Sequence, residues 1–261
     1  MKVYLVDSKQ WYITPEQANA YLAVLGTEYA NDIVAGENAL IGQLTSILRE
    51  TFAGPRKYVD LGPGDGKKTD VITRELVKQN LISHYECVDI QSAYIDIASK
   101  LAIQKGLTTS QYNGSFEDYL TQYTSDGANF IYLGATYCNL DREFDGKLSN
   151  AMHKSDLVYL SSALFPHNIE EIIKGYQTQK ISEIFAPICQ IHGIAPDNFH
   201  VEFNYSENQV EMGFRERNKF YILGVSRKPT KEEFASRISE NFTGELMSNS
   251  EHVGFVGKVR D

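Results

Sequence analysis

Residues 58–69 read YVDLGPGDGKKT, a short apolar segment that runs directly into a glycine-rich turn. We expect a strand at Tyr58–Leu61, the turn at Gly62–Gly66 and a helix from Lys68. Glycine at positions 62, 64 and 66 lets the backbone turn sharply and approach a ligand without a Cβ atom in the way. A helix that follows such a turn points its first amide N–H groups at the ligand, which suits a carboxylate or a phosphate. The stretch therefore predicts a ligand site at the end of this strand.

Strands and helices alternate after the turn, at spacings typical of βαβ units. The apolar pattern predicts further strands at Tyr85–Ile90, Gln111–Phe116, Asn129–Leu133 and Leu157–Ser161. Helices are expected at Lys68–Lys78, Ala93–Ala102, Glu117–Tyr123 and Asp145–Met152. This alternation favours an α/β fold with a doubly wound, Rossmann-like parallel sheet.

Both ends of the chain depart from this alternation. The first 56 residues predict a short strand or packed arm followed by helices at Pro15–Val24 and Gly36–Phe52. The residues after 162 predict one long helix, an antiparallel meander, a second helix and a final strand, at Ile169–Ile184, Phe199–Leu223, Lys231–Asn241 and Val253–Val259. We therefore expect an N-terminal helical segment (1–56) that covers the substrate site, and a main domain (57–261) with an antiparallel C-terminal strand pair. The meander either continues the sheet of this domain or belongs to a small cap.

The composition is that of a globular chain with an acidic balance. The 261 residues include 34 Asp and Glu against 25 Lys and Arg, a net charge of −9 that disfavours a nucleic-acid partner. Cys87, Cys138 and Cys189 lie far apart without CxxC spacing, which favours buried thiols over a zinc site or a disulfide framework. No stretch approaches the ~18 apolar residues of a membrane span, and we do not expect the first residues to form a signal peptide. We expect a cytoplasmic monomer or homodimer with a small-molecule substrate, no metal and no membrane association.

Two details of the turn discriminate between cofactors. In the dinucleotide-binding pattern G-x-G-x-x-G the third glycine would fall at Lys67, whose long side chain would block close helix packing. Asp60, two residues before the first glycine, can accept hydrogen bonds from groups around the amino-acid portion of a cofactor. Both details favour S-adenosylmethionine (SAM) over NAD. A tight turn without a ligand is the alternative.

Polar side chains follow the next two strands in the order that a SAM site requires. Asp89, near the end of the second strand, can accept both ribose hydroxyl groups, or it caps the helix that begins after it. Ser115 can meet the adenine amino group while Phe116 covers the ring, or the pair begins a capped short helix. Taken together, these positions indicate a SAM-dependent methyltransferase.

Several segments between about residues 58 and 214 resemble the histidine-specific SAM methyltransferases of the ergothioneine pathway. Lys68-Thr69 matches a lysine-threonine pair of that family, and Gly114–Glu117 matches its Gly-Asp-Phe-Glu segment, with Ser115 in place of the aspartate. The resemblance implies that Lys68 reaches the SAM carboxylate.

A third segment, FIYLGATYCNL at residues 130–140, resembles the family run Phe-Leu-Gly-Ser-x-x-Gly-Asn, with Cys138 in place of the second glycine. The resemblance implies that Gly134 belongs to the cofactor site and that Asn139 contacts the substrate amino acid. An amide offers both a donor and an acceptor, which suits an amino or carboxylate group. A turn or a helix cap is the alternative role for Asn139.

Weaker matches to this family lie outside the three segments described above. The resemblance implies substrate contacts for Tyr176, within the expected long helix, and for Tyr29. It gives Asn204-Tyr205 and Val210–Met212 a mostly structural role. The Glu-x-Ser pair with which the family recognises imidazole has no clear match, because the nearby candidates have the wrong spacing: Glu245, Ser248 and Ser250.

The sequence leaves several functions open. The first is N-methyl transfer to a small amine or amino acid, with Asn139 and Tyr176 placing the acceptor at the catalytic centre. The second is O-methyl transfer to a carboxylate or hydroxyl, with His167 or His200 as a base. The third is a SAM-binding module without transfer activity, and a NAD-dependent oxidoreductase fits the turn less well.

Overall fold

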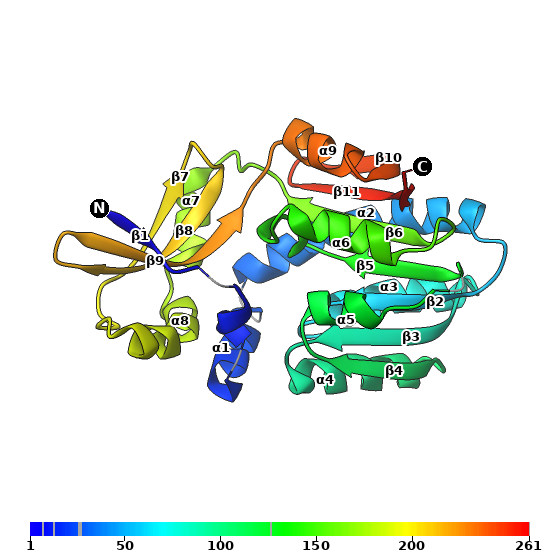
Figure 1. Cartoon of the computed structure of the whole chain (residues 1–261), viewed down its shortest axis with the longest axis horizontal. Helices are drawn as coiled ribbons and strands as arrows, with labels where there is room; N and C mark the ends of the chain where they lie inside the picture. The colour runs from blue at the N-terminus through cyan, green and yellow to red at the C-terminus, as the bar shows by residue number, and fades with distance from the viewer. Residues whose placement is uncertain (7, 13, 26–27, 126, 261) are drawn as a thin grey trace. The chain divides into compact units, whose positions relative to one another are not determined.

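The computed structural model describes the backbone of residues 1–6, 8–12, 14–25, 28–125 and 127–260 and, within these ranges, all side chains except those of residues 8, 9 and 28–34. The chain divides into two compact units (Figure 1). Unit 1 comprises Met1–Asp32 and Phe165–Pro229, and unit 2 comprises Ile33–Leu164 and Thr230–Asp261.

Unit 2 contains a sheet in which, among the described residues, seven strands lie in the order β10-β11-β6-β5-β2-β3-β4 (Figure 1). The strands are β2 (Arg56–Leu61), β3 (Ile82–Asp89), β4 (Thr108–Asn113), β5 (Asn129–Leu133), β6 (Leu157–Ala163), β10 (Phe242–Ser248) and β11 (His252–Val259). Strands β2 to β6 pair in parallel, while β11 runs antiparallel between β6 and β10. Every residue of β5 is buried, as in a parallel sheet that is covered on both faces.

Helices cover both faces of this sheet. They are α2 (Glu28–Thr51), α3 (Lys67–Lys78), α4 (Ser92–Gln104), α5 (Phe116–Gln122), α6 (Glu143–Ala151) and α9 (Lys231–Ser239). Successive residues of β2 point to opposite faces. Tyr58 packs in one core cluster with Leu44 of α2, and Val59 packs in a second cluster with Leu148 of α6 and Phe234 of α9. The doubly wound Rossmann-like sheet predicted from the sequence is confirmed. The sheet does end in an antiparallel C-terminal pair, of which we had placed only the second strand.

Unit 1 contains a second sheet, whose described strands follow the order β1-β9-β8-β7. Its elements are β1 (Lys2–Tyr4), a 3-10 helix (Ser8–Tyr12), α1 (Pro15–Leu25), α7 (Ile169–Tyr176), α8 (Gln179–His192), β7 (Phe199–Asn204), β8 (Gln209–Glu216) and β9 (Lys219–Arg227). Strands β7, β8 and β9 form the expected antiparallel meander, and β1 joins β9 in parallel. The two hairpin turns contain Asn208 and Arg217, with φ of 48° and 52°.

The division of the chain differs from the one we expected at residues 56 and 57. Residues 165–229, which we had assigned to the main domain, form a compact unit with the first 32 residues instead. The reason is pairing across the sequence, since β1 extends the meander as an edge strand of its sheet. The helix α2 belongs largely to unit 2, where it covers the sheet.

The expected long helix at Ile169–Ile184 is two helices, α7 and α8. The break lies at Thr178, whose hydroxyl accepts a hydrogen bond from the backbone N–H of Ile181 and so caps the N-terminus of α8. Apolar residues continue at helical spacing across the break, which is why the pattern alone does not reveal it.

Glu211 on β8 joins three strands of unit 1 at one buried carboxylate. Its oxygens accept hydrogen bonds from Lys2 Nζ, Tyr4 Oη and Asn204 Nδ2, each at 2.7 Å. Burial alone would raise the pKa of Glu211, but Lys2 and the polar donors more than offset it and lower that pKa. The carboxylate therefore helps to fix β1 to the meander.

Replacing Tyr4 with phenylalanine removes one of these donors and should lower the free energy of unfolding of unit 1 by about 1 kcal/mol. The single tryptophan, Trp11, lies in unit 1 and donates to Leu223 O at 2.9 Å. Its fluorescence during urea denaturation therefore reports on this unit. The matched control is Tyr205→Phe, at a tyrosine that is 67% exposed. Equal stability losses for the two variants would contradict the role given to Glu211.

Candidate functional site

The candidate residues of unit 2 lie where the parallel strands end. From β2 the chain builds β3 and β4 on one side of the sheet, and then β5 and β6 on the other. The strand order therefore reverses between β2 and β5, and the loops that follow these two strands leave in different directions. In open α/β sheets, ligands bind at such a reversal of strand order, at the carboxyl ends of the strands.

The glycine-rich loop connects β2 to α3 in a conformation that requires glycine. Gly62, Gly64 and Gly66 have φ of 81°, 58° and 74°. A Cβ atom at Gly62 would lie 3.1 Å from Cζ of Phe116, and one at Gly66 would lie 2.7 Å from Cδ1 of Leu101 on α4. Gly62 thus lets the loop approach the Phe116 ring, and Gly66 lets it pack against α4.

Asp60 holds the first turn of α3 against the sheet. It is buried, and its Oδ2 accepts hydrogen bonds from the Thr69 hydroxyl at 2.6 Å and the Tyr85 hydroxyl at 2.9 Å. Burial raises the pKa of Asp60 to about 6, although the two hydroxyls and Lys68 oppose this rise. These two hydrogen bonds tie α3 and β3 to the end of β2 and so help to shape the loop.

Asp89 ends β3 beside the same loop and is 7% exposed. Its Oδ1 accepts a hydrogen bond from the backbone N–H of Gln91 at 2.9 Å, which forms a turn before α4. The N-cap of α4 is Gln91 itself, so Asp89 is not the helix cap that we considered. Burial raises its pKa to about 7, while the backbone amides of Gln91 and Gly64 favour the charged form. The contact with Gly64 brings the loop and this carboxylate together.

Ser115 and Phe116 follow β4. The Ser115 hydroxyl accepts from the backbone N–H of Asp118 at 3.1 Å and donates to its carboxylate at 2.7 Å, which caps α5 as in the structural alternative. The Phe116 ring lies against Gly62 and makes an edge contact with Phe144, with ring centroids 6.4 Å apart. Phe116 is thus placed at the loop, and the Ser115 hydroxyl is engaged within its own helix.

Lys68 on α3 forms an ion pair with Glu37 on α2, a residue that the sequence did not lead us to. The Nζ–Oε2 distance is 3.0 Å, and Glu37 is 1% exposed. Oε1 of Glu37 accepts from the Tyr132 hydroxyl at 2.8 Å and the Ser161 hydroxyl at 2.5 Å. The signal for Glu37 was present, because it lies three residues before Leu40 on the apolar face of the helix.

Burial alone would raise the pKa of Glu37. The charge of Lys68 and the hydrogen bonds from Ser161, Lys68 and Tyr132 outweigh burial, so the pKa is lowered and the carboxylate is ionised. A Cβ atom at Gly134 would lie 2.9 Å from Glu37 Oε1 and 3.0 Å from Lys68 Nζ. The ion pair therefore abuts the backbone at the carboxyl end of β5.

Asn139 lies five residues beyond Gly134, at the end of a 3-10 helix (Tyr137–Asn139). It is half-buried, and its backbone N–H donates to Thr136 O at 2.9 Å. Asn139 therefore lies in a turn, as in one of the alternatives, and the N-cap of α6 is Arg142 instead.

The remaining candidates lie outside unit 2. Tyr176 ends α7 in unit 1, where its hydroxyl donates to the Ser226 hydroxyl at 2.8 Å. The side chain of Tyr29 lies outside the described residues. His200 on β7 contacts Arg215 at 2.8 Å and Glu202 at 3.4 Å, which places it in a surface charge cluster.

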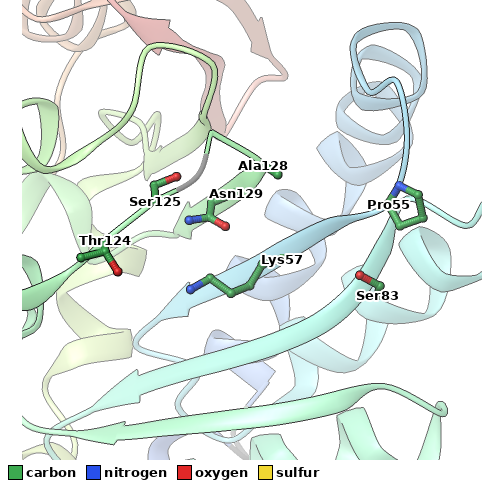
Figure 2. A pocket seen from close by; sticks show the side chains of 7 residues that line it. All are labelled: Pro55, Lys57, Ser83, Thr124, Ser125, Ala128 and Asn129. Atoms are coloured by element: carbon green, nitrogen blue, oxygen red, sulfur yellow. The ribbon is translucent and has the colours of Figure 1, made fainter.

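A pocket of about 600 Å³ lies at the opposite edge of the sheet (Figure 2). Figure 2 shows Pro55, Lys57, Ser83 and Asn129 near the amino ends of β2, β3 and β5. Its polar groups have protein partners: Lys57 pairs with Glu86 at 2.8 Å, and Asn129 Nδ2 donates to the Tyr123 hydroxyl. The candidate cofactor residues end these strands rather than begin them, so we do not assign the chemistry to this pocket.

Three further features concern the described residues as a whole. No helix among them is long and apolar enough to cross a membrane, and no three of their His, Cys, Asp or Glu side chains gather in a way that would hold a metal ion. Cys87, Cys138 and Cys189 are buried thiols.

Comparison with protein families finds a match over residues 32–180 to the family described as histidine-specific methyltransferase, SAM-dependent. This match spans more than half of the chain. The chain belongs to this family. It is a SAM-dependent methyltransferase, and SAM is its cofactor.

Solved structures support the fold of this methyltransferase. The PH0226 protein of Pyrococcus horikoshii OT3 matches with a TM-score of 0.54 and 12% identity, covering 90% of this chain and 93% of that one. A SAM-dependent methyltransferase of Clostridium acetobutylicum ATCC 824 matches with a TM-score of 0.53 and 12% identity, covering 93% and 99%. The plantazolicin methyltransferase BamL matches with a TM-score of 0.51 and 14% identity, covering 96% and 93%. A search of curated proteins finds no match.

Proposed function

We propose that this methyltransferase transfers a methyl group from SAM to the nitrogen of a small amine or amino acid. The observation that carries the proposal is the match of residues 32–180 to a family described as histidine-specific, because this range includes Lys68, Gly134 and Asn139. A histidine-specific enzyme acts on a small amino acid, and such an acceptor offers nitrogen atoms to methylate.

The residues at the carboxyl edge of the sheet suit the parts of the cofactor. We assign the SAM carboxylate to Lys68 and the first turn of α3, because both present positive charge or N–H donors there. We assign the ribose hydroxyls to Asp89, and one face of the adenine to Phe116, which lies against the glycine loop. When bound, SAM supplies an electrophilic methyl group on a sulfonium.

The acceptor nitrogen must be held in line with that methyl group and must be neutral to attack. We assign its placement to Asn139, whose amide can accept from the amine or donate to a neighbouring carboxylate. A contact between Tyr176 and the acceptor stays a prediction. We further propose that α2, from the N-terminal helical segment, covers the substrate, which the position of Glu37 beside Gly134 supports.

The test is incubation of the purified protein with SAM and a panel of the twenty amino acids and simple amines. We expect at least one product that is heavier by one methyl group, carries the methyl on nitrogen and survives base, together with S-adenosylhomocysteine. Asn139→Ala should lower kcat/KM roughly tenfold to a hundredfold, the effect of losing one or two polar contacts. Asn150→Ala, on the exposed side of α6, should leave kcat/KM unchanged.

Other outcomes identify the competing functions. A base-labile methyl ester would show that the acceptor atom is oxygen. Binding of SAM without formation of S-adenosylhomocysteine, across the whole panel, would indicate a binding module and overturn the proposal.

A further inference from the structure

The Glu37–Lys68 ion pair joins an enclosed carboxylate to a lysine that solvent reaches. The side chain of Glu37 is 1% exposed, whereas that of Lys68 is 25% exposed. The hydroxyls of Tyr132 and Ser161 both donate to Oε1 of Glu37 and hold its carboxylate in place. Oε2 then faces the Lys68 Nζ atom at 3.0 Å. One partner of the pair is therefore fixed by the protein, and the other presents part of its side chain to a ligand.

The pair lies at the same end of the sheet as the candidate cofactor residues. A Cβ atom at Gly134, just after β5, would lie 3.0 Å from Lys68 Nζ and 2.9 Å from Glu37 Oε1. The ammonium therefore lies at the carboxyl end of β5, beside the reversal of strand order between β2 and β5. All of these residues belong to unit 2. The ion pair is thus placed to affect a ligand at this end of the sheet.

A lysine needs a partner of this kind to keep one position. Its ammonium ends a flexible four-carbon stem, and ordering such a side chain costs up to about 2 kcal/mol. Asp60 offers a second carboxylate nearby, since the charge of Lys68 opposes the rise in the pKa of Asp60. Without Glu37, the ammonium would be free to turn toward Asp60 or into solvent. Glu37 orders Lys68 before a ligand binds, so less side-chain entropy is lost on binding.

We propose that Glu37 is a positioning residue for the cofactor, which holds the Lys68 ammonium where Lys68 receives the amino-acid carboxylate of SAM. The inference rests on the assignment of that carboxylate to Lys68 in the proposed function. Because Glu37 is enclosed, it acts on the ligand only through Lys68, as a supporting residue behind a binding residue. Its effect should therefore be confined to ligands that carry the amino-acid portion.

The test is calorimetric binding, at pH 8, of two ligands that share an adenosine thioether. S-adenosylhomocysteine carries the amino-acid portion, and 5′-methylthioadenosine lacks it. The wild type should bind S-adenosylhomocysteine more tightly, by a factor of about ten or more. Glu37→Gln keeps the size of the side chain but removes its charge, and should weaken S-adenosylhomocysteine binding about tenfold. Binding of 5′-methylthioadenosine should stay unchanged, which also shows that the variant is folded.

A double-variant cycle tests whether Glu37 acts through Lys68. In a Lys68→Met background, Glu37→Gln should no longer weaken S-adenosylhomocysteine binding, because no ammonium is left to position. Glu50→Gln, at an exposed position of α2, is the matched control and should bind both ligands like the wild type. A role of Glu37 in stability alone predicts equal losses for the two ligands, or a loss that persists in the Lys68→Met background. Either result would overturn the proposal.

The failure of this inference is distinguishable from that of the proposed function. Tighter binding of S-adenosylhomocysteine to Glu37→Gln would show that Glu37 competes with the ligand for Lys68, and would overturn the positioning role. Loss of the preference for S-adenosylhomocysteine in Lys68→Met but not in Glu37→Gln would also overturn it, while the assignment of Lys68 would stand. Absence of methyl transfer to any nitrogen would overturn the proposed function and leave support for the positioning role from these binding measurements intact.

Discussion

Glu37→Ala should lower the free energy of unfolding by about 3–5 kcal/mol, the usual cost of removing one partner of a buried ion pair. The loss is large because the Glu37 carboxylate binds three groups at once, on α3, β5 and β6: Lys68, Tyr132 and Ser161. Circular dichroism during urea denaturation is the suitable measurement, because the single tryptophan lies in unit 1.

Two variants test whether the charge pair is the cause. Glu50→Ala, at an exposed position of the same helix, should cost little. The double variant Glu37→Gln with Lys68→Met removes both charges and should be more stable than Glu37→Ala. A loss below about 1 kcal/mol for Glu37→Ala, similar to that of a surface substitution, would contradict this role.

The same ion pair has a defined pH dependence. The folded-state pKa of Glu37 lies below the ordinary glutamate value of 4.5, so the stability that Glu37 contributes is complete above that pH. It is lost as the pH falls below 4.5 through the folded-state pKa.

The affinity for S-adenosylhomocysteine should fall as the pH drops below about 7. The pKa of Asp89 is raised to about 7, so its carboxyl is largely protonated at pH 6 in the ligand-free protein. If the ionised form accepts the ribose hydroxyls, affinity is constant above this pKa and weakens by up to about tenfold per pH unit below it. Calorimetric titrations between pH 6 and pH 8.5 measure this directly.

Asp89→Asn should weaken binding at pH 8 by roughly tenfold to a hundredfold, because hydrogen bonds to a charged acceptor are lost, and should remove the pH dependence. Asp96→Asn, at an exposed position of α4, is the matched control and should behave like the wild type. An affinity that does not change with pH in the wild type, or the same pH dependence in Asp89→Asn, would contradict the assignment of Asp89 to the ribose.

The raised pKa has a second consequence for the ligand-free protein. The folded chain holds the Asp89 proton more tightly than the unfolded chain, in which the pKa of an aspartate has its ordinary value of 3.8. The Asp89 contribution to the free energy of unfolding therefore decreases as the pH rises from about 4 to about 7.

The central strands of the sheet could be predicted from the sequence because they are buried on both faces. We predicted Asn129–Leu133 and the start of the strand at Leu157, where apolar residues run without a break. The edge strands were harder to predict. The strand that we placed at Gln111–Phe116 is β4 (Thr108–Asn113), and β10 was missed, because both are edge strands with few buried residues. Periodicity weakens where only one side of a strand is paired and covered.

The division into units could not be predicted because it depends on pairing between distant segments. β1 joins β9 across more than 200 residues, and a three-residue strand carries almost no pattern of its own. The meander itself was predicted from its turns and alternating residues, but the sheet to which it belongs was not.

The candidate site shows the same limit. The loop at 62–66, Asp89 and Phe116 follow their strands directly, so local order along the chain located them. The role of Glu37 depends on a partner that is distant in the sequence, Lys68. A lone acid on the apolar face of a helix becomes informative only when its partners are known.

A crystal structure of this chain with S-adenosylhomocysteine is the most direct test of the account. We predict that the ribose hydroxyls lie within about 2.6–3.2 Å of the Asp89 carboxylate, beside the loop at 62–66, with the amino-acid carboxylate at Lys68 and the first turn of α3. Binding at the other edge of the sheet, in the pocket at Pro55, Lys57 and Ser83, or with the ribose away from Asp89, would contradict it.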